Sequence, residues 1–161
     1  SGVGSSDRSD GGTTARVFGT FLTWLQDKIS QVFVVATAND VTRLPPEFLR
    51  KGRFDELFFV DLPDSAQRSE IFRIHLNRRG HDQAISDVED FSDLVTATDG
   101  FSGAEIENVV ISALYDAFDA DQPLSAAHLL KAVQEVTPLS VTQAERIQES
   151  RKWAESRARK A

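Results

Sequence analysis

Cysteine, methionine and long apolar runs are all missing from this 161-residue sequence. Without cysteine, the chain can form neither a disulfide nor a thiolate metal site. No run approaches the roughly 18 apolar residues that a membrane-spanning helix needs, and no basic-then-apolar secretion signal opens the chain. The missing methionine and the opening SGVGSSDRSDGG suggest a fragment that starts within a domain. A cytoplasmic or organelle-matrix protein without a membrane partner is expected.

Composition and charge are those of an ordinary globular protein. The chain is 40% hydrophobic and 27% charged, and its length suits one average domain or two small ones. A net charge of −7 gives no general attraction to nucleic acid, so a nucleic-acid partner is not expected. Three scattered histidines, His75, His81 and His128, lack metal-ligand spacing, and no metal site is predicted from them.

The first part of the chain mixes one helix with two buried strands. Residues 1–12 are almost devoid of apolar side chains and are expected to be mobile. Apolar residues then recur at helical spacing over 13–28. Residues 32–36 and 57–60 are short apolar runs, rich in β-branched or aromatic residues, that predict strands of a parallel sheet buried on both faces. Between them, Pro45–Pro46 predicts the start of a short helix that Gly52 ends.

Only helices are predicted after Pro63. Asp64 and Gln67 can cap a helix over 64–79, with an apolar face of Ile71, Phe72, Ile74 and Leu76, and a short helix is expected near 91–97. Ser102 and Glu105 form a capping box for a helix to about residue 118. Further helices are expected over 123–136, and from Ser140, capped with Gln143, towards residue 161. The fold class is therefore α/β: part of a parallel sheet over 1–63, then a helical domain over 64–161.

Three polar features carry the candidate chemistry. Asn39 follows the first strand, where parallel sheets bind ligands and where an amide can orient a water or a phosphate oxygen. Arg50 and Arg53 are three apart, on one helical face or at its end, and planar guanidinium groups suit phosphate charge. Gly103 opens a helix whose free N–H groups would let a nucleotide approach. Taken singly, each has a more common explanation: a turn asparagine, two solvated arginines and a plain capped helix.

The order and spacing of these features resemble the AAA family of ATPases. The segment ATANDVTRLPPEFLRKGRF at 36–54 is similar to the second region of homology in that family, and GFSGAEIENVV at 100–110 is similar to its lid. The resemblance covers about residues 13–137 and is closest to a cyanobacterial and plastid branch. It implies a P-loop NTPase sheet followed by a helical lid, in a bacterial cytoplasm or a plastid stroma.

The resemblance implies a role for each site residue. Asn39 would be sensor 1, which holds the attacking water or the γ-phosphate in line. Arg50 and Arg53 would be arginine fingers acting on ATP in the neighbouring subunit, where such a finger contributes about 10³–10⁵ in rate. His75 would lie near the ribose or adenine, and Gly103 with Ala104 would pack against the nucleotide. Action in trans implies a homo-oligomeric ring, usually a hexamer, working on a protein substrate.

Three residues depart from the family pattern. Asp40 stands where arginine is common, Pro46 where aspartate is common, and Lys51 where proline is common between the fingers. These differences affect loop geometry more than the implied roles. They argue against one well-known unfoldase subgroup.

The largest departure is the lack of a G-x-x-x-x-G-K-[ST] phosphate loop and of a strand ending in Asp–Glu. ATP and Mg²⁺ would be cofactors of an intact subunit, and this chain alone is expected neither to bind MgATP tightly nor to hydrolyse it. The family's phosphate-loop strand lies between the two strands predicted here. We therefore expect both strands to be completed by the rest of the subunit.

Two other functions stay open at this point. The chain could belong to a non-catalytic AAA module that supplies arginine fingers and ring contacts only. It could also belong to a nucleic-acid motor, which the acidic net charge disfavours. The basic cluster RKWAESRARK at 151–160 is better explained as a solvated helix end.

Overall fold

The computed structural model describes residues 7–27, 31–41, 44–50, 52–81 and 88–161, with side chains of the first helix described from Arg16 onward. The chain divides into two compact units, residues 1–58 and 59–161. Each unit is described by itself. None of the helices described is both long and apolar enough to serve as a transmembrane span.

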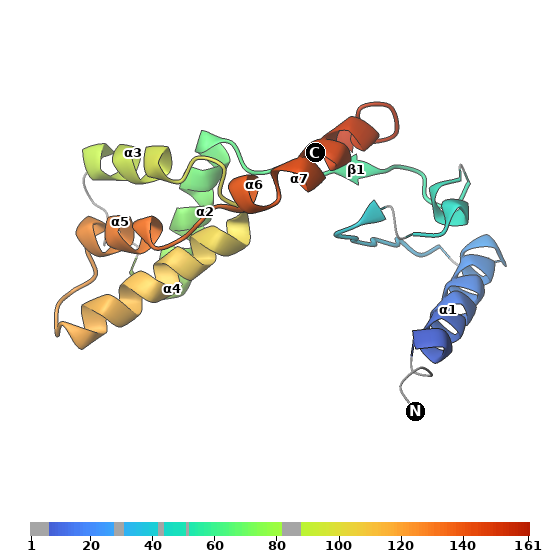
Figure 1. Ribbon diagram of the computed structural model, residues 1–161, viewed down its shortest axis with the longest axis horizontal. Helices are drawn as coiled ribbons and strands as arrows, with labels where there is room; N and C mark the ends of the chain where they lie inside the picture. Colours follow the sequence, from blue (N-terminus) through green and yellow to red (C-terminus); the bar gives the residue numbers. More distant parts are fainter. Residues whose placement is uncertain (1–6, 28–30, 42–43, 51, 82–87) are drawn as a thin grey trace, which may run out of the picture. The chain divides into compact units, whose positions relative to one another are not determined.

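The first unit is organised around α1, Asp7–Asp27 (Figure 1). The helix starts earlier than predicted: residues 7–12, expected to be mobile, are helical, whereas residues 1–6 lie outside the described part. The predicted apolar face is confirmed in part: Leu25 is buried and Phe21 half-buried, whereas Val17 and Trp24 are exposed. Phe18 meets Phe48 edge-on with ring centroids 5.1 Å apart, and Phe21 stacks on the same ring at 6.0 Å. Phe48 is the buried residue of the short 3-10 helix η2, Pro46–Leu49, which starts at the predicted prolines.

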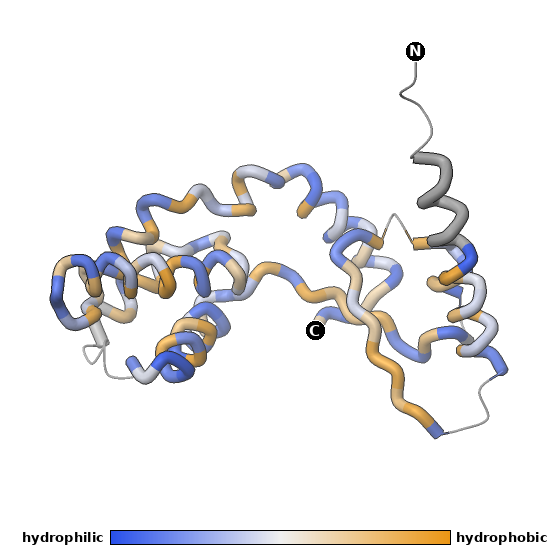
Figure 2. The backbone as a smooth tube through the Cα atoms, turned by 90° about the horizontal axis from the view of Figure 1, so that it is seen from below, coloured by the Kyte–Doolittle hydropathy of each residue, from blue (hydrophilic) through white to orange (hydrophobic). Residues whose placement is uncertain are grey.

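The predicted strand at 32–36 is not formed. Residues 31–38 carry no strand assignment, and most of their apolar side chains are exposed, with Phe33 93% and Val35 75% exposed and Val34 half-buried. This run is the long orange stretch in Figure 2. The composition typical of a buried strand is present, but no strand of the described residues pairs with this segment, so no sheet encloses its side chains.

The second predicted strand is shorter and more exposed than expected. Strand β1 covers only Phe58–Phe59, and Phe58 and Val60 are 62% and 79% exposed. Its partner is β2, Arg159–Lys160, in a two-stranded sheet. Pairing with the end of the chain was not predicted from the sequence.

The second unit is a helical domain formed by α2 Ser65–Arg78, α3 Val88–Ala97, α4 Gly103–Asp119 and α5 Ala126–Gln134 (Figure 1). Each helix turns a stripe of apolar residues inward, as helical periodicity predicts. Of the apolar positions expected on α2, Phe72 and Leu76 are buried, Ile71 is partly buried and Ile74 is exposed. The core consists of Phe72, Leu76, Leu94, Phe101, Ile106, Val109, Val110, Ala113, Ala117, Leu124, Leu129, Ala132 and Val133.

Two predicted capping boxes are confirmed. The backbone N–H of Gln67 donates to the Asp64 side chain at 2.8 Å, and the Gln67 side chain accepts from the Asp64 backbone. At the start of α4, Ser102 and Glu105 make the equivalent exchange. Glu105 also accepts from the backbone N–H of Leu139 at 2.6 Å. This contact ties the start of α4 to α6.

Arg68 is a buried cation that joins α2 to α3. Its guanidinium donates to the backbone oxygens of Pro63 at 3.0 Å and Val95 at 3.1 Å, and it approaches Asp99 at 3.3 Å. Only the Nε atom, which is buried, has no partner in the described part of the chain. Arg68 therefore links the residue before α2 to the last turn of α3, where Val95 also accepts from the hydroxyl of Thr98 at 3.1 Å.

The end of the chain departs most from the predicted helices. Helix α5 begins at Ala126 rather than at Pro123. The predicted last helix is two helices, α6 Leu139–Thr142 and α7 Ala144–Ala154, without the predicted side-chain caps. The chain then turns, and the N–H of Ala161 donates to the carbonyl of Phe59 at 3.1 Å. Arg151 reinforces this return through a two-oxygen contact with Asp61 at 2.9 and 3.0 Å.

Candidate functional site

Asn39 lies at a bend that follows the extended residues 31–38, and it is exposed. An amide there points a donor and an acceptor at solvent or at a ligand. Asn39 was predicted to follow a buried strand, but no strand is assigned to the described residues 31–38 before it.

Arg50 ends helix η2 and is exposed. Its backbone is extended, with φ −74° and ψ 137°, and its side chain has no bonding partner in the described part of the chain. The helix has already ended at Leu49, so Arg50 and Arg53 do not share a helical face. Gly52, at φ 92°, makes the turn between them in a conformation that L-residues rarely adopt.

Arg53 is anchored to helix α1. It is half-buried, and its Nη1 atom donates to the backbone oxygen of Leu22 at 3.1 Å. This carbonyl belongs to the C-terminal half of α1, where the helix dipole favours a cation. The two arginines therefore differ. Arg53 is bound to helix α1, whereas Arg50, three residues earlier in the sequence, is exposed.

His75, Gly103 and Ala104 belong to the second unit, where α2 meets the first turns of α4. His75 lies in the last turn of α2, with its side chain 14% exposed. Its Nδ1 atom is 3.4 Å from Oε1 of Glu107, one turn beyond Gly103 on α4. Ile71, one turn before His75, lies beside Gly103. The structure thus brings His75 and the start of α4 together.

Gly103 is not required by packing within the chain. A Cβ placed there would come no nearer than 3.7 Å to Cδ1 of Ile71, which is ordinary contact, and the backbone has no positive φ. Ala104, next along the helix, is exposed. The first turn of α4 therefore presents small residues and backbone N–H groups at the surface.

Arg79 and Glu107 lie beside His75 and were not among the site residues predicted from the sequence. Nη2 of Arg79 donates to Oε1 of Glu107 at 2.9 Å, and Nη1 donates to the His75 backbone oxygen at 3.1 Å. The hydrogen bond from Arg79 has the largest influence on the pKa of Glu107 and lowers it, against a smaller opposing effect of desolvation. The available signal was the spacing of Arg79, four residues after His75 on one helical face.

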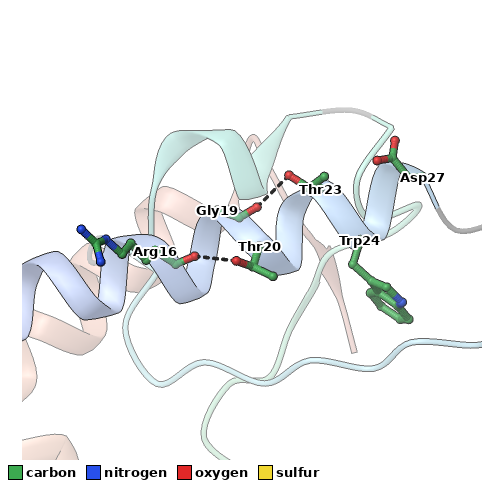
Figure 3. Close-up of a pocket in the computed structure, with 6 residues that line it drawn as sticks. All are labelled: Arg16, Gly19, Thr20, Thr23, Trp24 and Asp27. Atoms are coloured by element: carbon green, nitrogen blue, oxygen red, sulfur yellow. Dashed lines mark hydrogen bonds between the residues drawn. The ribbon is translucent and has the colours of Figure 1, made fainter.

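A hollow on α1 is separate from the predicted site residues. It is lined by Arg16, Gly19, Thr20, Thr23, Trp24 and Asp27, which follow one side of the helix (Figure 3). Both threonine hydroxyls donate to carbonyls one turn earlier, Thr20 to Arg16 and Thr23 to Gly19, each at 3.0 Å. Their donors are thus used within the helix, and no ligand chemistry is assigned to the hollow.

No group of three or more His, Asp or Glu side chains in the described ranges could hold a metal ion.

Comparison with known proteins matches both units. The sequence model of the ATPase family associated with various cellular activities (AAA) matches residues 2–62, and that of the AAA+ lid domain matches residues 87–131. The chain belongs to the AAA family of ATPases. Membership confirms the predicted fold class, a P-loop NTPase module followed by a helical lid.

This AAA chain is similar to proteins from algae and archaea. It is 46% identical over 153 residues to the uncharacterized AAA domain-containing protein ycf46 of Guillardia theta, covering 94% of this chain and 30% of that protein. It is 44% identical over 160 residues to ycf46 of Pyropia yezoensis, covering 98% and 32%. The proteasome-activating nucleotidase of Saccharolobus solfataricus is 36% identical over 111 residues, covering 68% and 27%. The AAA chain thus spans about a third or less of each relative.

Proposed function

We propose that this chain is part of a ring-forming AAA ATPase subunit that couples ATP hydrolysis to the remodelling of a protein or complex. The observation that carries the proposal is the arginine segment of the first unit: Arg50 is exposed, and Arg53 is held to α1 through Leu22. An anchored turn that presents a guanidinium is suited to stabilising phosphate charge in a neighbouring subunit.

Within this proposal, the first unit supplies the groups that act on the phosphates. Asn39 is sensor 1 and orients the attacking water or the γ-phosphate. Arg50 reaches ATP bound by the adjacent subunit of the ring, and Arg53 acts beside it while fixing the turn. The exposure of Asn39 and Arg50 supports these roles, because neither side chain is committed to the interior of the chain.

The second unit supplies the lid. His75 contacts the ribose or adenine, and Gly103 with Ala104 packs against the nucleotide. The support for this assignment is that a side chain at Gly103 would meet no obstacle in the fold. Because packing within the chain does not require a glycine here, the missing side chain at Gly103 leaves room for the nucleotide.

The proposal includes the setting of the intact protein. The α/β part spans residues 1–63 and the lid 64–161, the ring is a homo-hexamer, and the location is a bacterial cytoplasm or a plastid stroma. ATP and Mg²⁺ are bound by the intact subunit. This sequence contains neither the phosphate loop nor the Asp–Glu pair, so the chain alone binds MgATP at most weakly.

The experiment is ATP turnover by the natural full-length protein with Arg50→Ala or Arg53→Ala. Each change is expected to lower kcat by about 10³-fold or more while nucleotide affinity stays nearly constant, because a trans-acting arginine serves the transition state of its neighbour. Arg16→Ala, an exposed arginine on α1, is the matched control and should keep wild-type turnover.

Each alternative function has its own outcome in this experiment. Unchanged hydrolysis in both arginine variants would refute the finger assignment. A wild-type protein that assembles without any turnover would support the non-catalytic module. Turnover that depends on added DNA or RNA would support the nucleic-acid motor.

A further inference from the structure

A bridge of three side chains lies between the end of α2 and the start of α4. Arg79 donates to Oε1 of Glu107 at 2.9 Å and to the backbone oxygen of His75 at 3.1 Å. Its Nη1 atom also lies 3.3 Å from Nδ1 of the His75 ring. The guanidinium therefore contacts residues of both α2 and α4, and it lies beside the imidazole ring of His75.

The identity of the donor decides which ring nitrogen of His75 carries the hydrogen. A guanidinium only donates and stays protonated in proteins. A donor that faces Nδ1 requires a lone pair there, so the neutral ring carries its hydrogen on Nε2. Oε1 of Glu107 lies at a similar distance from Nδ1, 3.4 Å, but it already accepts the shorter hydrogen bond from Arg79 at 2.9 Å.

The ring of His75 lies near the start of α4. His75 lies one helical turn beyond Ile71, the residue that contacts the site of Gly103, and Glu107 lies one turn beyond Gly103 on α4. The opposite edge of the imidazole, with the Nε2 hydrogen, has no partner among the described residues. A neutral N–H donor suits an uncharged oxygen or a ring nitrogen better than a phosphate, which favours a cation.

We propose that Arg79, held by Glu107, is a positioning residue that fixes His75 as an Nε2–H donor to an uncharged acceptor on the nucleoside part of the bound nucleotide. This inference rests on the proposed function, because it assumes that His75 contacts the nucleotide. It adds that the affinity of the lid for the nucleoside depends on two residues that do not touch it.

The test is a steady-state KM and kcat comparison on the natural full-length protein. Arg79→Met removes the donor and keeps the length of the side chain, so KM for ATP should rise about fivefold with little change in kcat, the equivalent of one hydrogen bond. Glu107→Gln keeps an acceptor without its charge and should raise KM less. Arg79→Lys should restore part of the lost affinity.

A double variant separates positioning from a merely structural role. If Arg79 acts through His75, then Arg79→Met should not raise KM further in a His75→Ala background. Asp116→Asn, also on α4, is the matched control. It removes the charge from a 2.7 Å ion pair with Lys131 of α5 and should leave KM unchanged. Thermal unfolding of every variant identifies any that fail to fold, and Glu107→Gln then takes the place of Arg79→Met.

The outcomes distinguish this inference from the proposed function. ATP turnover with a KM that Arg79→Met leaves unchanged overturns the positioning role alone. Additive effects of Arg79→Met and His75→Ala on KM also overturn it. A wild-type protein without ATP turnover overturns the proposed enzymatic function as well.

Discussion

The two units of this chain bury their apolar residues to very different degrees. In the second unit, helices α2 to α5 enclose a continuous core in which Phe72, Ile106 and Leu129 are fully buried. In the first unit, the strongest apolar run of the sequence lies in solvent, with Phe33 93% exposed. Apolar sequence is common to both, so composition alone does not decide burial.

The difference follows from where each kind of element finds its hydrogen bonds. A helix satisfies its backbone within itself and needs only one face covered. A strand needs neighbours along its edges before its side chains can be enclosed. Helices α2 to α5 find their partners within residues 59–161, whereas residues 32–36 have no paired strand among the described residues.

The largest expected effect contrasts these two environments directly. Ile106→Ala removes a fully buried side chain at the centre of the second unit and should lower the free energy of unfolding by about 2–5 kcal/mol. Phe33→Ala removes a larger side chain and should change it by no more than about 0.5 kcal/mol. Urea unfolding of this chain, followed by circular dichroism, measures both. Equal losses would mean that residues 32–36 are packed after all.

An intermediate effect concerns Arg68, the buried cation of the second unit. Arg68→Met keeps most of the apolar stem but removes the donor to the Pro63 carbonyl and one of two donors to the Val95 carbonyl, which also accepts from Thr98. This loss should cost about 1.5–3 kcal/mol. The matched control is Arg73→Met on the same helix, which among the described residues loses a contact of its guanidinium with the Phe91 ring at 5.2 Å. The same urea titration should show a loss under about 1 kcal/mol for the control. A neutral Arg68→Met would show that both carbonyls find other donors.

The smallest effect is a pH dependence from Glu107. Arg79 lowers the pKa of Glu107 in the folded state, so its ion pair stabilises the fold above the ordinary carboxyl pKa of 4.5 and is lost as the pH falls through the lower folded value. The stability difference between the wild type and Glu107→Gln should therefore be present at pH 7 and shrink below pH 4.5. Unfolding midpoints across this range measure it. A difference that stays constant down to pH 3 would contradict the assignment.

The sequence predicted the helical unit well because its signals are local. Asp64 and Ser102 start their helices with the expected capping boxes, and α4 ends at Asp119, next to the predicted end near residue 118. The failures lie where partners are distant in sequence. Pairing of Phe59 with Ala161 joins residues about a hundred positions apart, and no local pattern encodes it. The predicted last helix ended early for this reason, because its final residues pair with β1.

For the candidate site too, the residues were predicted from the sequence, whereas their contacts came from the structure. Asn39, Arg50, Arg53, His75, Gly103 and Ala104 were chosen from sequence by motif order, and their roles stay predictions. The structure adds that Arg53 is bound to Leu22, whereas Arg50 is exposed. It also adds the bridge from Arg79 to His75 and Glu107. Such contacts depend on which helix faces meet, which spacing within one helix does not reveal.

By itself, the sequence determined that this chain belongs to the AAA family and that its second half is a helical domain, since motifs, caps and apolar periodicity act over a few residues. Only the tertiary structure decided which apolar runs are buried, which arginine is exposed and which residues surround His75. The physical reason is that burial and side-chain contacts depend on partners brought together from distant positions, and these partners exist only when the chain is folded.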